Sequence, residues 1–254
     1  MATFEEELER LRKPINRLTN LALFLKKVIV RGEENWVRQG PNVIVGNHIG
    51  SYKDVGLILR VAPRPIFFTA NEELFHYETF SALVTRHLNR HLRNFAPFVR
   101  MVLKPFYIYV VSYISSHIRR IGTIPVSLEG SRMDAVRKCE VLLRQGRAVI
   151  ALQGRGRVQV RDPNPYVVAF RRGPAVMAYD LYTQEGISVA VTPLSFFGTH
   201  LMWGVPARIR VNVGPPMFIK DYLGADATET IKKFRRALER TVDRLFLDSI
   251  RWEL

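Results

Sequence analysis

His48 and Asp54 are the two residues of this chain whose types and spacing best suit acid–base chemistry. They lie in VIVGNHIGSYKD, residues 43–54, where an apolar run leads into Asn47 and His48 and Asp54 follows soon after. A histidine, with an ordinary pKa of about 6.5, accepts a proton at neutral pH. A neighbouring carboxylate fixes the tautomer of the ring and stabilises the imidazolium that forms. The pair suits a general base with its orienting partner, although a structural or surface pair is the commoner meaning of such spacing.

Short runs rich in β-branched and aromatic residues predict the strands of an α/β fold. In chain order these runs are VIVRG, PNVIVGN, RPIFFTA, IGTIPV, RAVIAL, ISVAVTPLSF and RIRVNVG. Helical spacing occurs at 54–61 and 131–145, two more helices are expected within 76–118, and a last one starts at Asp226. We therefore expect a mixed, mostly parallel sheet covered by helices. His48 would then lie at the carboxyl edge of the sheet, where such folds bind ligands.

Two of the expected helices carry clear start or stop signals. The helix at 131–145 has a capping residue, Ser131, and ends before Gly146. Its apolar stripe includes Cys139, so we expect a packed core thiol there. The last helix has an apolar face and a basic face, which is usually a solvated surface and only secondarily a lipid headgroup contact. The basic residues are Lys232, Lys233, Arg235, Arg236 and Arg240.

The chain is expected to consist of an N-terminal amphipathic segment, residues 1–27, and an α/β domain, residues 28–254. The helical stripe of the first segment is Phe4, Leu8, Leu11, Ile15, Leu18, Ala22 and Leu25. Because the ring of Pro14 clashes with the preceding turn, we expect a kink or a break into a helix pair. The segment either caps the core or lies half sunk in a bilayer interface, and both interpretations stay open.

No segment of the chain reaches the roughly 18 to 20 apolar residues that a membrane-spanning helix needs. The stretch from Phe106 to Ile114 is nearly all apolar or aromatic, with cations on both sides. It is too short to span a bilayer. It is either a buried core segment or an interfacial anchor.

The charge of the chain favours anionic partners. Lys and Arg number 38 against 23 Asp and Glu, which gives a formal net charge of +15. Such a surface attracts anionic lipids, nucleic acids, phosphorylated substrates and acidic carrier proteins. The single cysteine excludes an internal disulfide and a cysteine-based zinc site, so we expect no metal and a reducing compartment. An acidic run, Glu5 to Glu7, stands where a secretory signal would be basic, so we expect a cytoplasmic protein.

Several segments of the chain form an ordered series. They are VIVRGEENWVRQGPNVIVGNHIGSYKD at 28–54, RPIFFTANEELF at 64–75, IGTIPV at 121–126, RAVIALQGRGR at 147–157, FRRGPAVMA at 170–178 and VAVTPLSFFG at 189–198. Together they resemble the glycerolipid acyltransferase family, which includes the lysophosphatidate and glycerol-3-phosphate acyltransferases. In that family an NH-x4-D box, a second motif, a PEGTR motif and a final motif follow in this order.

The resemblance implies an acyl transfer between two substrates. In the family, a hydroxyl of a glycerol-phosphate or lysophospholipid attacks an acyl thioester on coenzyme A or acyl carrier protein, with no further cofactor and no covalent acyl-enzyme. His48 would be the general base and Asp54 the carboxylate that orients it. The residues that would bind substrate are Asn47, Ser51, Arg132, Gln153, Gly154, Arg155 and Arg157.

The His–Asp box departs from the family pattern by one residue. Five residues separate His48 from Asp54 where the family has four, and the extra one is assigned to Gly50. A glycine can be absorbed as a local bulge, so the ring and the carboxylate are still expected to meet.

The second and third motifs also depart from the family pattern. Leu128 stands where the second motif ends in arginine. In the third motif, Gln153 replaces the glutamate and Gly156 stands where the arginine is expected, with Arg155 and Arg157 on either side. The cationic phosphate site is therefore either shifted onto neighbouring arginines or absent.

Two functions follow from these observations. The favoured one is an O-acyltransferase, peripheral on the cytoplasmic face of the cell membrane, with a lipid acceptor, an acyl-CoA or acyl carrier protein donor and an anionic membrane surface as partners. The alternative is a catalytically silent relative that binds membrane lipid through its basic surface. Activity is favoured because His48 and Asp54 are present while only the specificity motifs differ. Nucleic acid is disfavoured, since the GRGR run at 154–157 is single and lies between expected strands.

Overall fold

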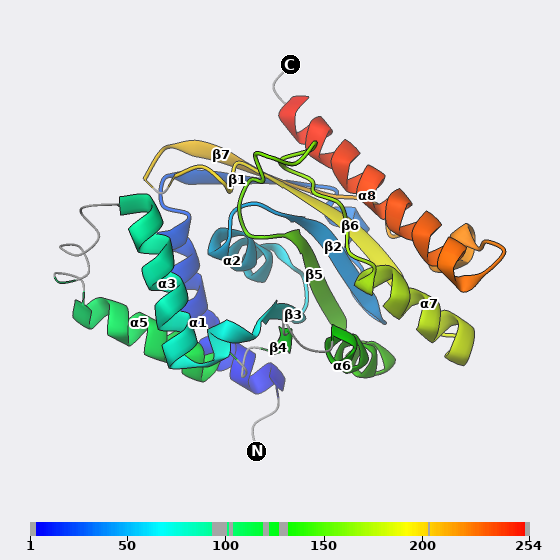
Figure 1. The fold of residues 1–254 in the computed structure, drawn as a ribbon, viewed down its shortest axis with the longest axis horizontal. Helices are drawn as coiled ribbons and strands as arrows, with labels where there is room; N and C mark the ends of the chain where they lie inside the picture. Colours follow the sequence, from blue (N-terminus) through cyan, green and yellow to red (C-terminus); the bar gives the residue numbers. More distant parts are fainter. Residues whose placement is uncertain are drawn as a thin grey trace.

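A seven-stranded sheet with helices on both faces forms the centre of the molecule (Figure 1). The computed structural model describes residues 4–92, 101, 104–118, 122–126, 132–202 and 204–251. In chain order the strands are β1 (Lys26–Arg31), β2 (Asn42–His48), β3 (Ile66–Asn71), β4 (Thr123–Val126), β5 (Ala148–Gly154), β6 (Ala190–Phe197) and β7 (Ala207–Val213). Each of the seven runs singled out in the sequence overlaps one of these strands.

The sheet is mixed and mostly parallel, as predicted. Its strand order is β1-β7-β6-β2-β5-β3-β4. Strand β2 pairs in parallel with both β5 and β6, and β3 pairs in parallel with β5 and β4. Strand β7 is antiparallel to β6, and β1 is parallel to β7. Strand β2 therefore lies at the middle of the sheet, with its last residue, His48, at the carboxyl edge of the parallel part.

Helices pack on the sheet and complete two hydrophobic cores. The helices are α1 (Phe4–Ala22), α2 (Tyr52–Val61), α3 (Tyr77–Leu92), α5 (Lys104–His117), α6 (Arg132–Arg144), α7 (Gly173–Glu185) and α8 (Ala227–Arg251). One core joins the sheet to α6, α7 and α8, and contains Leu143, Leu181 and Phe234. The other joins the opposite face to α2 and to the segment after α1, and contains Leu57 and Leu23.

Helices α6 and α8 begin or end as their sequences predict. Gly146, with φ of 71°, follows α6, and the Asp226 carboxylate accepts the N–H of Glu229 at 2.7 Å at the start of α8. Cys139 is buried on the core side of α6, where burial, with Glu140 as a smaller cause, raises the pKa of its thiol to about 12. The packed thiol is therefore confirmed. Ser131 lies outside the described residues.

Helix α7 was not predicted as a helix. It starts with Gly173 and Pro174, and a proline in the first turn is compatible with a helix because its missing N–H would have no partner there. Its buried residues include Ala175, Met177 and Ala178 as well as Leu181. They lie on one face, but Val176, Tyr179 and Tyr182 on the other sides are also apolar or aromatic, so the sequence lacks the polar face by which an amphipathic helix is recognised.

Helix α1 runs without a break from Phe4 to Ala22 and contains Pro14, so the predicted break into a helix pair is not found. A proline inside a helix removes one hydrogen bond. The end of α1 is held by tertiary packing, because Thr19 is buried against α2, where the missing side chain of Gly56 leaves room for it, and Leu23 enters the core. The segment thus packs against the α/β domain.

Helix α5 is only partly buried. Val111 is in the interior, whereas Ile108 and Tyr109 are exposed and Tyr109 stacks on Tyr113. The part of the chain that the structure describes contains no helix long and apolar enough to cross a membrane.

Candidate active site

His48 and Asp54 meet where β2 turns into α2. His48 is the last residue of the strand, and Asp54 lies in the first turn of the helix. Nδ1 of the His48 ring lies 2.8 Å from Oδ2 of Asp54. The carboxylate is completely buried, whereas 22% of the histidine side chain is exposed. The acid is therefore shielded from water while the ring remains accessible.

Two backbone amides fix the same carboxylate oxygen. The N–H groups of Ile49 and Gly50 donate to Oδ2 of Asp54 at 3.0 and 2.7 Å. Ser51 has a positive φ of 54°. The turn at this residue brings Asp54 into contact with His48 although five residues separate the two. Because an ionised carboxylate only accepts hydrogen bonds, Nδ1 of His48 carries the proton and Nε2 is left as the accepting atom.

Two glycines leave room around His48. In the parallel pairing of β2 with β5, His48 lies beside Gly154. A Cβ on Gly154 would lie 2.8 Å from the carbonyl oxygen of His48, and a Cβ on Gly156 would lie 3.2 Å from Nε2 of the ring. Both glycines have positive φ, 130° and 69°. The backbone of the GRGR turn therefore approaches the accepting nitrogen as closely as a glycine allows.

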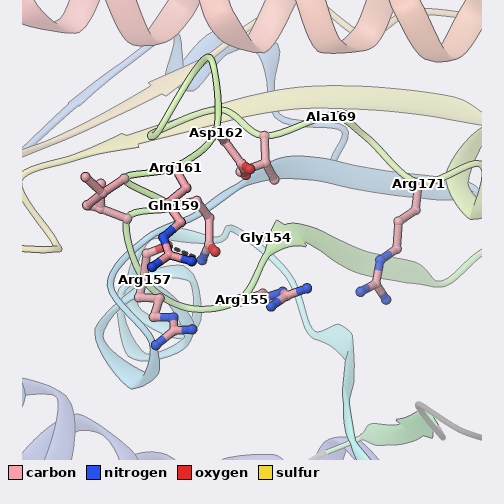
Figure 2. A pocket seen from close by; sticks show the side chains of 11 residues that line it. Gly154, Arg155, Arg157, Gln159, Arg161, Asp162, Ala169 and Arg171 are labelled. Atoms are coloured by element: carbon pink, nitrogen blue, oxygen red, sulfur yellow. Dashed lines mark hydrogen bonds between the residues drawn. The ribbon is translucent and has the colours of Figure 1, made fainter. Parts of the chain in front are cut away.

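Arginines line a cleft of about 640 Å³ beside this turn (Figure 2). Figure 2 shows Arg155 next to Gly154, with Arg157 on the same stretch of loop and Arg171 on the far side of Gly154. Arg161 also lines the cleft, together with one acidic residue among those described, Asp162. Guanidinium groups bind phosphate through paired, charge-assisted hydrogen bonds, so this cleft suits a phosphorylated ligand.

The side chains of Asn47 and Gln153 are buried and hydrogen-bonded to the backbone, and substrate contact by these two residues stays a prediction. Asn47 is 0% exposed; its amide donates to the carbonyl oxygens of Tyr166 and Phe196 and accepts the N–H of Phe196 at 2.7 Å. Gln153 is 4% exposed; it donates to the carbonyl oxygen two residues earlier and accepts the N–H of Arg171 at 2.8 Å. Both side chains tie their strands to neighbouring backbone.

The other predicted substrate-binding residues have different positions. Arg155 and Arg157 are exposed and line the cleft with Gly154. Ser51 is exposed and lies against Gly156, beside the His48 ring. The side chain of Arg132 lies outside the described residues. Substrate contact by these residues stays a prediction.

Three polar residues near Asp54 were not predicted from the sequence: Lys53, Thr199 and His200. Nζ of Lys53 donates to the carbonyl oxygen of Leu201 at 2.5 Å, and its pKa is lowered by burial and then by Lys26, while Asp54 opposes the shift. Burial, followed by Lys53, lowers the pKa of the His200 ring, so the ring is neutral at neutral pH. Thr199 is completely buried. The signal in the sequence was the polar pair Thr-His directly after the final apolar motif.

Comparison with known proteins identifies the family. A model of the Acyltransferase family matches residues 27–196, a range that contains the His–Asp turn, the GRGR turn and most of the final motif. The chain belongs to this family. The fold of this acyltransferase is similar to the crystal structure of the 1-acyl-sn-glycerophosphate (LPA) acyltransferase PlsC from Thermotoga maritima, with a TM-score of 0.54 and 18% identity over 96% of this chain and 82% of that one. A search of curated proteins gave no significant match.

An alanine at Gly156 should shield the His48 ring from reagents. Gly156 and Gly186 both have φ of 69°, so alanine at either position carries a similar backbone strain, but a Cβ at Gly186 meets nothing within 4 Å. We expect diethylpyrocarbonate to modify His48 markedly more slowly in Gly156→Ala than in the wild type or Gly186→Ala, as followed by mass spectrometry of the peptide that contains His48. Equal rates in all three proteins would contradict an open Nε2 edge beside the GRGR turn.

Proposed function

We propose that this acyltransferase moves a fatty acyl group from an acyl thioester, on coenzyme A or acyl carrier protein, to a hydroxyl of a lysophospholipid or glycerol-phosphate-like acceptor. The observation that carries the proposal is the 2.8 Å contact between His48 and Asp54, which leaves Nε2 of the ring beside a turn that opens into an arginine-lined cleft.

In the proposed reaction His48 is the general base. Its Nε2 takes the proton of the acceptor hydroxyl as that oxygen attacks the carbonyl carbon of the thioester, and Asp54 stabilises the imidazolium. The tetrahedral intermediate then expels the thiolate, breaking the carbon–sulfur bond, and the proton passes from His48 to the leaving thiolate. No covalent acyl-enzyme forms, so no serine or cysteine nucleophile is needed. The deep burial of Cys139 and its raised thiol pKa agree with this route.

In this proposal the exposed arginines of the cleft bind the phosphate of the acceptor. Arg155 and Arg157 flank Gly156, whose Cα lies close to the His48 ring. A phosphate held there leaves a hydroxyl of the same glycerol unit within reach of Nε2. The two arginines would take the place of the arginine that the third motif of the family supplies at the Gly156 position.

We also propose that the protein works as a peripheral protein on the cytoplasmic face of the membrane. An apolar corner, formed by exposed residues at the end of α1 and in the β6–β7 loop, would contact the bilayer. Nζ of Lys26 ties these two segments together by donating to the carbonyl oxygens of Met202 and Val205 at 2.9 and 2.5 Å. Lys53, next to Asp54, bonds the same loop at Leu201. The residues of the apolar corner are Leu21, Phe24, Leu25, Met202 and Val205.

A catalytically silent lipid-binding relative is the second candidate function. The observation that favours it is Gln153, which replaces the glutamate of the third motif and whose amide is taken up by backbone. The two candidates share the membrane surface and differ in whether acyl transfer occurs.

Replacing His48 by alanine should abolish most of the transfer. Loss of a general base lowers rates by roughly 10²- to 10⁴-fold. The measurement is transfer from labelled acyl-CoA and acyl carrier protein to a panel of lysophospholipids and glycerol 3-phosphate. His76→Ala, which removes an exposed histidine before α3, is the matched control and should retain wild-type rates. If wild type and His48→Ala are both folded and equally inert across the panel, the silent candidate replaces the enzyme.

Replacing Arg155 or Arg157 by glutamine should raise KM for a phosphorylated acceptor by about tenfold, because each variant loses a charge-assisted hydrogen bond. A monoacylglycerol acceptor, which has no phosphate, should show no such increase. Arg38→Gln, an exposed arginine in the loop before β2, is the matched control. Equal losses on both kinds of acceptor would mean that the cleft does not bind the phosphate.

Replacing Leu25 by asparagine should weaken binding to vesicles. Leu25 is 51% exposed in the apolar corner, and Val141, on α6, is 50% exposed elsewhere and serves as the control position. Losing a leucine side chain from the bilayer interface should reduce partition by roughly tenfold. Co-sedimentation with vesicles of phosphatidylcholine and phosphatidylglycerol measures this, in low and high salt. Equal partition of Leu25→Asn and Val141→Asn would show that the apolar corner does not contact the membrane.

A further inference from the structure

The second oxygen of the Asp54 carboxylate lacks a hydrogen-bond partner among the described residues. Oδ2 accepts from His48, Ile49 and Gly50, whereas Oδ1 is buried with none. A buried oxygen of an ionised group that has given up water without gaining a donor destabilises the charged form. The site therefore requires a donor at Oδ1.

Thr199 lies on the other side of the same space. It is completely buried, and its hydroxyl also lacks a partner within the described ranges. A Cβ added to Gly50 would lie 2.5 Å from Oγ1 of Thr199 and 2.6 Å from Oδ1 of Asp54. The unpaired hydroxyl and the unpaired carboxylate oxygen thus converge on the position that the missing side chain of Gly50 leaves empty. A small adjustment of either side chain, or a single water, would join them.

The other polar groups near Asp54 do not supply this donor. Lys53 directs its ammonium group to the carbonyl oxygen of Leu201, and Lys26 directs its own to the carbonyls of Met202 and Val205. The neutral ring of His200 packs edge-on against Tyr166, and its buried Nδ1 has no partner among the residues that the structure describes. Thr199 is therefore the side chain whose hydroxyl is free to donate next to Oδ1.

We propose that Thr199 is a positioning residue for the active site, whose hydroxyl donates to Oδ1 of Asp54 and keeps Oδ2 aligned with Nδ1 of His48. Gly50, the residue by which this chain lengthens the family box, leaves the room for that contact. The longer turn and the threonine that follows the final motif thus act together on Asp54. Its effect on catalysis rests on the proposed function, but its effect on the His48 ring does not.

The test compares Thr199→Ser with Thr199→Ala, which differ by one oxygen atom. Nitrogen-15 NMR of the imidazole, with the His48 signals assigned by their absence in His48→Ala, reports which ring nitrogen carries the proton. We expect the wild type and Thr199→Ser to show a single neutral tautomer with the proton on Nδ1. Thr199→Ala should show a mixture of tautomers and a roughly tenfold lower kcat with little change in KM, the loss expected for one charge-assisted hydrogen bond.

Ser195→Ala is the matched control, because Ser195 lies on β6, four residues before Thr199, and its buried hydroxyl likewise has no partner in the described part of the chain. It should lower the melting temperature about as much as Thr199→Ala does but leave the tautomer unchanged. If Thr199→Ala keeps the wild-type tautomer, or if Ser195→Ala disturbs it equally, the proposal is overturned. If the tautomer shifts in Thr199→Ala and no protein transfers acyl groups, the positioning role holds and the proposed function fails.

Discussion

The buried negative charge of Asp54 is the constraint on which the site depends. A carboxylate with no contact with water must be met by donors that the fold holds in place, and here two backbone amides and a ring nitrogen converge on one oxygen. The amides of Ile49 and Gly50 can both reach it only because the chain reverses at Ser51, a residue with positive φ. The contact between His48 and Asp54 is therefore set by the closure of the turn rather than by the number of residues in it.

The register of the sheet brings the separate motifs to one edge. Strand β2 pairs with β5 so that His48 faces Gly154, and it pairs with β6 so that Gly46 faces Leu194. The first, third and final motifs therefore end side by side although more than a hundred residues separate the first from the last. Asn47 fixes this arrangement, because its side-chain amide forms hydrogen bonds with both the N–H and the C=O of Phe196 at the end of β6. A one-residue slip between β2 and β6 would break these bonds and move the His–Asp turn away from Thr199.

Features that depend on local pattern could be predicted from the sequence. The seven strands, the spacing of α6 and α8 and the packing of Cys139 follow from apolar periodicity and turn residues, and His48 with Asp54 follows from residue chemistry next to a strand end. The continuity of α1 through Pro14 could not be predicted, because it depends on packing against α2. Helix α7 could not be predicted either, because apolar and aromatic residues lie all around its first turns and leave no polar face to mark it.

The hydrogen-bond partners of the polar residues in the site could not be predicted from the sequence either. An asparagine or glutamine beside a histidine has the chemistry of a substrate ligand, and only the neighbouring strands decide whether its amide is free. The amide of Asn47 is taken up by backbone groups of distant segments, and that of Gln153 by the nearby carbonyl of Ala151 and the N–H of Arg171. Thr199 was overlooked for the converse reason, because a threonine after a strand is ordinary until the turn at Gly50 is seen to face it.

The change from glutamate to Gln153 in the third motif can be understood from the same bonds. The side chain of Gln153 donates to the carbonyl oxygen of Ala151 and accepts the N–H of Arg171, and a carboxylate could do only the second of these. The amide also adds no negative charge beside a cleft that Arg155, Arg157, Arg161 and Arg171 line. The cleft is therefore more cationic than it would be with a glutamate at this position, so the departure from the motif need not weaken the attraction of a phosphorylated ligand. Residue 153 holds the turn, and the positive charge of the cleft comes from the arginines around it.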